Sequence, residues 1–287
     1  MRILVLLIFL LWNCNPKAQD SSHKNELTVE FSLPKKLKEV SGIALSKDRK
    51  TIWTIEDHGN KNVVYGLDRE GKLEAEVLVD AENTDWEDII SDTSGNIYIG
   101  NFGNNNNDRR DLAILKLDLT SPSASTTKVV QTTTFHYEGQ TEFPPKKSGW
   151  LYDCEAFVEM DGNFYLFTKN RSKGFDGTFL VFKVPNKEGD FEAKLIGKLK
   201  LDGGYNDAAI TSASINAKKD KIVLLTHKNI HILSGFTADD FNAARIEKVS
   251  LNHNSQKEGV VFLDDSTLLI ADEKEKKDGG KVYRFSL

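Results

Sequence analysis

Three glutamates stand at the start of short runs of strand-forming residues, in stretches that resemble one another. The stretches read DWEDII, DCEAFV and KEGVVF, and their glutamates are Glu87, Glu155 and Glu258. If the three positions are equivalent, their carboxylates meet at one place in the fold, where repulsion raises at least one pKa unless a cation lies among them. Oxygen ligands without thiolates or clustered histidines favour Ca²⁺ over Zn²⁺. The pattern therefore predicts a calcium site.

These stretches belong to a unit that recurs along the chain. Each unit opens with a short strand, a turn and a second strand rich in aromatic and β-branched residues. Two further strands follow each of the first four openings, but only one, 280–287, follows the fifth. The stretch 26–34 precedes the first unit and can supply the missing strand. The five openings span residues 39–57, 85–103, 153–170, 211–227 and 257–273.

A recurring unit of four strands is typical of a β-propeller. We therefore predict an all-β fold with five four-stranded blades, closed by the N-terminal strand pairing into the last blade. Closure hides the open sheet edges that would otherwise bind other chains, so we expect a monomer. The propeller would occupy residues 26–287 as a single domain. Six blades are the alternative, which requires residues 85–148 to be split.

In a propeller the first strand of each blade lines a central channel. The aligned openings place Ser41, Glu87, Glu155, Ala213 and Glu258 at one position, so that three carboxylates converge near the axis. In the alternative interpretation these glutamates accept hydrogen bonds from backbone amides of neighbouring blades. The predicted metal ligands are Glu87, Glu155, Glu258 and Asp272, with supporting oxygens from Asp85, Asp88 and Asp153. The predicted ligand-binding residues at the channel mouth are Glu56, Asn101, Arg109 and Asp153.

The segment NFGNNNNDRRDL, residues 101–112, is rich in residues that favour tight turns and left-handed backbone. We expect a compact loop at a channel mouth. Its Arg109 and Arg110 could bind an anion through paired hydrogen bonds, although solvated arginines are the alternative. Cys154 stands between two carboxylates, which raise a thiol pKa, and we expect it to be structural.

The N-terminus predicts export. One positive charge at Arg2 precedes an apolar run, residues 3–12, which is too short to span a membrane and has the length of a signal sequence. Leu11, three residues before Cys14, resembles a lipobox, so residues 1–14 form a predicted lipoprotein signal ending at Cys14 and residues 15–25 a flexible tether. We expect the lipid on Cys14 to hold the protein at the outer membrane, facing the periplasm. A cleaved secretory peptide or an N-terminal membrane anchor are the alternatives.

Composition excludes other classes of function. The net charge of -5 and the pI of about 5.8 give no basic surface for nucleic acid. The sequence has no G-x-S-x-G, H-E-x-x-H or P-loop motif. Only two cysteines are present, so no disulfide framework is expected.

The motifs EVSGIA, DWEDI, DCEAF and EGVVF, followed by strands such as IWTIED and LLIADE, resemble the SdiA-regulated proteins. This resemblance extends from Glu39 to Glu273 and implies an exported β-propeller with a bound calcium ion and no characterised activity. Ala213 departs from the pattern. The E-x-S-G and E-G elements resemble, more remotely, the esterase-like phytases and the calcium-dependent lactonase propellers.

We expect a binding or scaffold role, in which the channel mouth holds a small-molecule or protein ligand. The first alternative is a calcium-dependent hydrolase of phosphoesters, esters or lactones, in which the cation lowers the pKa of a bound water. In that enzyme Glu155 or Glu87 would orient the water and Arg109 or Lys169 would neutralise developing charge. Glycoside cleavage by two carboxylates is a further alternative. The sequence assigns no catalytic residue and leaves enzymatic activity open.

Overall fold

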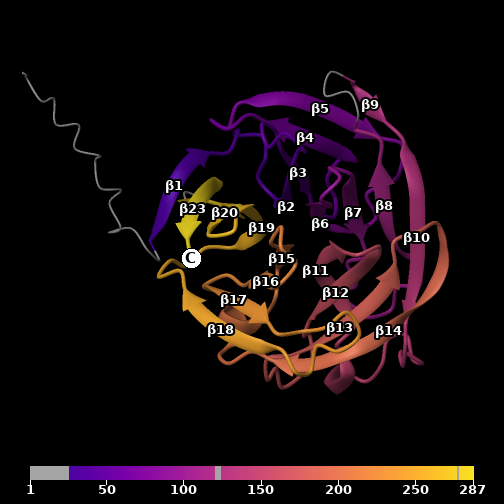
Figure 1. Ribbon diagram of the computed structural model, residues 1–287. Coiled ribbons are helices and arrows are strands. Elements are labelled where there is room, and N and C mark those ends of the chain that lie inside the picture. Colours follow the sequence, from indigo (N-terminus) through magenta and orange to yellow (C-terminus); the bar gives the residue numbers. More distant parts are fainter. Residues whose placement is uncertain (1–25, 120–123, 277) are drawn as a thin grey trace, which may run out of the picture.

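The computed structural model describes residues 26–119, 124–276 and 278–287. Within these residues the strands surround a central axis as a β-propeller, which confirms the predicted fold class (Figure 1). The helices among them are one α-helical turn, α1 (Tyr205–Ala208), and one 3-10 turn, η2 (Lys147–Gly149). Neither described helix is long and apolar enough to cross a membrane. The predicted signal and tether, residues 1–25 with Cys14, lie outside the described residues.

The strands form antiparallel groups in which sequence order runs from the axis outward. The first group contains β2 (Val40–Leu45), β3 (Ile52–Glu56), β4 (Val63–Leu67) and β5 (Leu73–Val79). The second contains β6 (Trp86–Ser91), β7 (Ile97–Asn101), β8 (Leu112–Leu117) and β10 (Val129–Tyr137). The third contains β11 (Asp153–Met160), β12 (Asn163–Lys169), β13 (Thr178–Pro185) and β14 (Gly189–Lys200). The fourth contains β15 (Ser212–Ile215), β16 (Lys221–Leu225), β17 (Asn229–Ser234) and β18 (Arg245–Ser250).

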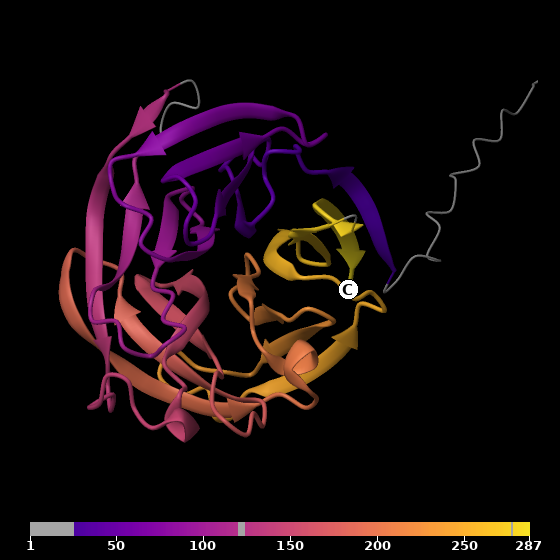
Figure 2. The same cartoon turned by 180° about the vertical axis from the view of Figure 1, so that it is seen from behind.

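The last group joins the two ends of the described chain. It contains β19 (Lys257–Asp264), β20 (Thr267–Asp272), β23 (Lys281–Ser286) and β1 (Leu27–Ser32). Strand β1 pairs antiparallel with β23, as predicted, and Figure 2 shows the two side by side from behind. The Arg284 guanidinium donates two hydrogen bonds to the Glu30 carboxylate, at 2.8 and 2.7 Å, which fixes this pairing. The hairpin β21 (Lys274–Glu275) and β22 (Asp278–Gly279) lies between β20 and β23 in the chain.

Two outer strands add a contact that the sequence did not predict. Strand β10 pairs in parallel with β14, from Thr133 and Gly189 to Tyr137 and Ala193, which merges the second and third groups into one eight-stranded sheet. The short β9 (Thr126–Thr127) pairs in parallel with β5 of the first group. Residues 85–148 thus supply the second group and an edge strand for the first.

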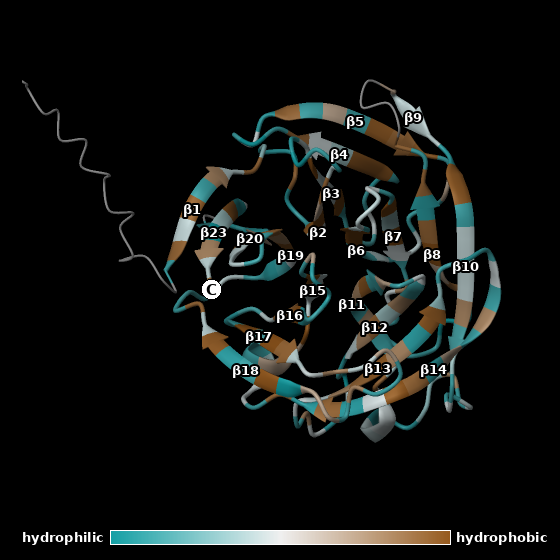
Figure 3. Ribbon diagram, in the orientation of Figure 1, coloured by the Kyte–Doolittle hydropathy of each residue, from teal (hydrophilic) through white to brown (hydrophobic). Residues whose placement is uncertain are grey.

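The innermost strands β2, β6, β11, β15 and β19 each contact the next, and β19 contacts β2, so that they form a closed ring. Side chains of neighbouring groups fill the space between them in separate apolar clusters. The outermost strands alternate between apolar and polar residues, visible as brown and teal along β5, β10 and β14 in Figure 3. This alternation is typical of strands with one face against a core and one toward solvent. We call the two ends of this ring its mouths, one at the starts and one at the ends of the inner strands.

Candidate functional site

Asp88, the residue after Glu87, links inner strands through hydrogen bonds. Its side chain is 1% exposed, and its carboxylate lies 3.3 Å from the Ser212 hydroxyl of β15 through both oxygens. The amide of Ile89 donates to it at 3.0 Å, and the backbone amides of Phe157 and Ala213 lie near enough to lower its pKa. One carboxylate of β6 is therefore bonded to β15 and lies beside the backbone of β11.

The remaining inner strands join this cluster, which we call the Asp88 hub. The Val260 amide of β19 donates to the Ser212 hydroxyl at 3.2 Å. Gly42 of β2 packs against the carboxylate so closely that a Cβ there would lie 2.5 Å from Asp88 Oδ1. Burial raises the pKa of Asp88 well above its ordinary value, although the donated hydrogen bonds oppose the shift. The alternative interpretation of the glutamates is that an acid bonds to neighbouring blades. In the structure Asp88 has that role.

The starts of the inner strands form a mouth rich in buried charge. Glu87, Glu155 and Glu258 are 7%, 4% and 6% exposed. Burial lowers the pKa of Lys169, but the Glu155 and Glu258 carboxylates outweigh it and hold that pKa above its ordinary value. Burial, and then Glu155 and Asp153, raise the pKa of Glu87. The side chains predicted to converge therefore act on one another or on a shared lysine at this mouth.

Two cations of the chain neutralise the carboxylates of β11. Lys169 Nζ lies 3.0 Å from Glu155 Oε2, and Arg171 lies 2.6 Å from Glu155 Oε1 and 2.6 Å from Asp153 Oδ2. Burial favours the neutral form of Glu155, yet Lys169 and Arg171 outweigh it and lower the pKa of Glu155. Arg171 was not identified from the sequence, where the only signal is the KNR triplet after a strand.

Glu87 has no such partner. Among the described residues its carboxylate accepts no hydrogen bond and forms no ion pair, although the residue is only 7% exposed to solvent. A Cβ on Gly103 would lie 2.2 Å from Glu87 Oε1 and 2.4 Å from Asp85 Oδ2. Because both distances share one point, the two oxygens are at most 4.6 Å apart, the sum of those distances. Gly103 therefore leaves room for two carboxylates that a side chain would displace.

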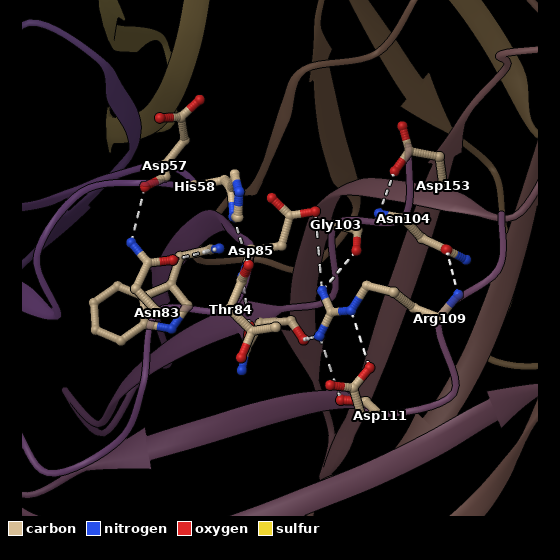
Figure 4. A network of polar contacts seen from close by, with 12 residues as sticks. Asp57, His58, Asn83, Thr84, Asp85, Gly103, Asn104, Arg109, Asp111 and Asp153 are labelled. Atoms are coloured by element: carbon tan, nitrogen blue, oxygen red, sulfur yellow. Dashed lines mark hydrogen bonds and ion pairs between the residues drawn. The ribbon is translucent and has the colours of Figure 1, made fainter. Parts of the chain in front are cut away.

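Arg109 lies beside this pair. Its guanidinium donates to the Gly103 carbonyl at 2.6 Å and to Asp111 Oδ1 at 3.0 Å, and it lies 4.0 Å from Asp85 Oδ2 (Figure 4). Burial raises the pKa of Asp85, and Arg109 opposes that shift. The predicted anion clamp does not form as a pair, because Arg110 stacks on Phe143, 3.7 Å from the ring centroid.

The loop that carries Arg109 is compact, as predicted. Asn104 and Asn107 are buried, and the Asn107 backbone is left-handed, with φ at 54°. Asn104 donates from its side chain to the Tyr152 carbonyl at 2.9 Å, and Asn107 Oδ1 accepts the Tyr152 amide at 2.8 Å. These amides therefore fasten the second strand group to the third.

The other predicted residues have partners within the protein. Glu258 lies 3.2 Å from His227 Nε2. Asp272 accepts the Tyr283 hydroxyl and the Lys281 amide, each at 2.8 Å, on the side of β23. The carboxylate of Glu56 accepts the Lys38 amide at 2.9 Å, and Asn101 Oδ1 accepts the Asp85 amide at 3.0 Å.

A second group of acids lies toward the first and last strand groups. Burial raises the pKa of Asp57 to about 6, with contributions from Glu39 and Glu258. Burial likewise raises the pKa of Glu273 to about 9, and Glu258 and Asp57 add to the shift. Within the described part of the chain, no three His, Cys, Asp or Glu side chains are grouped closely enough to hold a metal ion together. The calcium site and its ligand set therefore stay predictions.

No family model and no curated protein matches the sequence. The structure is similar to a gluconolactonase from Xanthomonas campestris, with a TM-score of 0.51 and 11% identity over 91% of this chain and 89% of that one. It is also similar to the PQQ-bound aldose sugar dehydrogenase from Streptomyces coelicolor, with a TM-score of 0.53 and 8% identity over 90% and 97% of the chains. The shared feature is the propeller fold. The resemblance to the SdiA-regulated proteins stays a prediction.

Replacing Asp88 tests the hub. Asp88→Ala leaves the buried Ile89 amide and the Ser212 hydroxyl without this acceptor, and we expect the free energy of unfolding to fall by about 3 kcal/mol in denaturant titration. Asp88→Asn keeps one oxygen and should lose less. The exposed Asp108 is the control, since Asp108→Ala should change stability by less than about 0.5 kcal/mol. Equal effects of Asp88→Ala and Asp108→Ala would contradict the role of the hub.

The acids of the mouth predict a pH dependence. The pKa of Asp57 rises from 3.8 to about 6 on folding, so folding takes up a proton between those values. The free energy of unfolding therefore falls as pH rises through that range. Asp57→Asn should remove this contribution, so that its Tm exceeds that of the wild type by a few degrees at pH 7 but matches it at pH 4. The control is Asp108→Asn. If Tm changes with pH between 4 and 7 in the same way for the wild type, Asp57→Asn and Asp108→Asn, the prediction is wrong.

Proposed function

We propose that this chain is an exported β-propeller that binds Ca²⁺ between Glu87 and Asp85 and holds a ligand at the same mouth. The observation that carries the proposal is the Glu87 carboxylate, which is buried beside other acids and has no partner among the described residues. A buried charge without a partner is strongly unfavourable. A bound cation would remove that penalty.

The geometry suits an oxygen-seeking cation. Calcium binds oxygens at about 2.3–2.6 Å, so one ion can contact two oxygens up to about 5 Å apart. Glu87 Oε1 and Asp85 Oδ2 fall within that limit, since they are at most 4.6 Å apart. Glu155 and Asp153 already have Lys169 and Arg171 as counter-charges, so an added cation has most to neutralise at Glu87. Water and backbone carbonyls would complete the coordination.

Calcium titration tests this assignment. At free calcium about 100-fold above the Kd, binding should stabilise the fold by about 2.7 kcal/mol, seen as a rise in Tm of the wild type. Glu87→Gln should abolish most of that rise while keeping or increasing the Tm of the metal-free protein. The control is Glu159→Gln, a partly buried glutamate on the same kind of strand but toward the other mouth. Metal analysis of chelated and untreated protein gives the stoichiometry.

Two results would overturn the proposal. The first is an untreated wild type that retains no calcium and shows no shift in Tm. The second is an equal calcium-dependent shift in Glu87→Gln and Glu159→Gln, which would place the cation elsewhere.

A second candidate is a calcium-dependent hydrolase of lactones, esters or phosphoesters. The observation that favours it is the pairing of cations with acids: Lys169 and Arg171 stand beside Glu155, where they can oppose negative charge on a substrate. A bound calcium would supply a water of lowered pKa. The similar fold of a gluconolactonase agrees with lactone chemistry only at the level of architecture. Calcium-dependent turnover of such substrates, lost in Glu87→Gln, would support it; no turnover under any condition would exclude those substrates.

The anchor belongs to the same proposal. Lipid on Cys14 would hold the propeller, as a monomer, at the periplasmic face of the outer membrane, with a small-molecule or protein ligand at the mouth. Labelling of cells with a radioactive fatty acid should mark the wild type but not Cys14→Ala.

A further inference from the structure

A cavity of about 610 Å³ opens at the other mouth of the channel, away from the carboxylates described above. It is lined by the ends of all five inner strands and by the turns that follow them, so it lies on the axis of the ring. The buried Asp88 hub, at the level of Gly42, Phe157 and Ser212, lies between the two mouths. The volume of the cavity is in the range of sites that hold small molecules, about 300–1,000 Å³.

The wall of this cavity has an apolar component from every inner strand, and polar residues such as Ser91, Ser214 and Asn216 lie among the apolar ones. The apolar residues that line it include Ile43, Ile90, Val158, Ile215, Val260 and Phe262. Most of these side chains are buried, but Ile215 is only partly buried, and Ile90 and Phe262 are 8% and 7% exposed to solvent. An apolar molecule in the cavity would remove this surface from water, which is favourable by about 25 cal/mol per Å².

The acids at the rim are already satisfied by the protein. Asp92 accepts the Ser94 and Asn96 amides, each at 2.9 Å, and the Tyr98 hydroxyl at 3.0 Å. Other acids at or near the rim are bonded as follows: Asp264 accepts the Ser266 amide, Asp265 pairs with Lys218, Asp161 pairs with Lys219, and Glu159 accepts the Gly162 amide. These acids therefore have little need for a cationic ligand.

The cations of the first turn differ from these acids. Lys47 lines the cavity, and its ammonium group has no hydrogen-bond or ion-pair partner in the described part of the chain. Arg49 lines the same side, and within the described residues its guanidinium donates one hydrogen bond, to the Leu263 carbonyl, which leaves its other N–H groups for a ligand. Two cations on one turn give the rim one positive side, close to the apolar residues of the wall.

We propose that this cavity binds a fatty acid or a similar anionic amphiphile. The carboxylate head would accept charge-assisted hydrogen bonds from Lys47 and Arg49, and the apolar chain would lie between the strand ends from β2 to β19. This site is separate from the cation site of the proposed function and does not depend on it.

Titration calorimetry with dodecanoate below its micelle concentration tests the proposal in the soluble propeller. We expect saturable binding to the wild type and at least about tenfold weaker binding, about 1.4 kcal/mol, to the double variant Lys47→Glu, Arg49→Glu. The exposed Lys50, on the same turn but outside the cavity lining, supplies the control Lys50→Glu, which should bind as the wild type does. Ala217→Trp places a large ring at an exposed position of the lining and should block binding.

Further ligands and variants separate the parts of the proposal. Dodecanol and dodecyltrimethylammonium, with the same chain but no anion, should bind at least about tenfold more weakly than dodecanoate. Glu87→Gln should leave dodecanoate binding unchanged, because it changes only the opposite mouth. The proposal is wrong if dodecanoate does not bind, if dodecanol binds as tightly, or if the double variant and Ala217→Trp, folded by circular dichroism, bind it as the wild type does.

Discussion

The fold depends on one buried carboxylate, that of Asp88, around which the inner strands are packed and bonded. The hydroxyl of Ser212 lies 3.3 Å from it, the amides of Phe157 and Ala213 lie near enough to lower its pKa, and the Val260 amide donates to the same hydroxyl. Backbone donors at the centre of a ring have no strand to pair with, and a buried donor without a partner is costly. A single short acid meets this need because it offers two oxygens to several strands.

The hub also lies between two mouths that differ chemically. Before it, at the strand starts, acids and cations are packed with little exposure, and Glu87 is left without a counter-charge among the described residues. Beyond it, at the strand ends, the lining combines apolar and polar residues, with charged turns at the rim. One ring of strands thereby presents a mouth rich in buried acids and, at its other end, a cavity of about 610 Å³.

Closure of the ring comes from contacts that are distant in sequence. Strand β1 pairs with β23, and the Glu30 carboxylate binds Arg284, 254 residues away. On the outside, β10 and β14 pair in parallel, so that the second and third groups share one sheet. Such pairings leave fewer open strand edges, which limits association with other chains.

The sequence by itself determined the β-propeller and the closing role of residues 26–34, because the alternation of strands and turns repeats and the last unit lacks one strand. It also placed Glu87, Glu155 and Glu258 at strand starts, since homologous positions in a ring face one axis. Only the tertiary structure decided how each acid is satisfied: Glu155 receives Lys169 and Arg171, whereas Glu87 receives neither at bonding distance. Spacing along a strand fixes which face a side chain occupies, but the charge that meets it comes from a neighbouring strand or loop. For the same reason the role of Asp88, the close approach of Gly103 and the cavity beside Lys47 became visible only once the five inner strands were brought together.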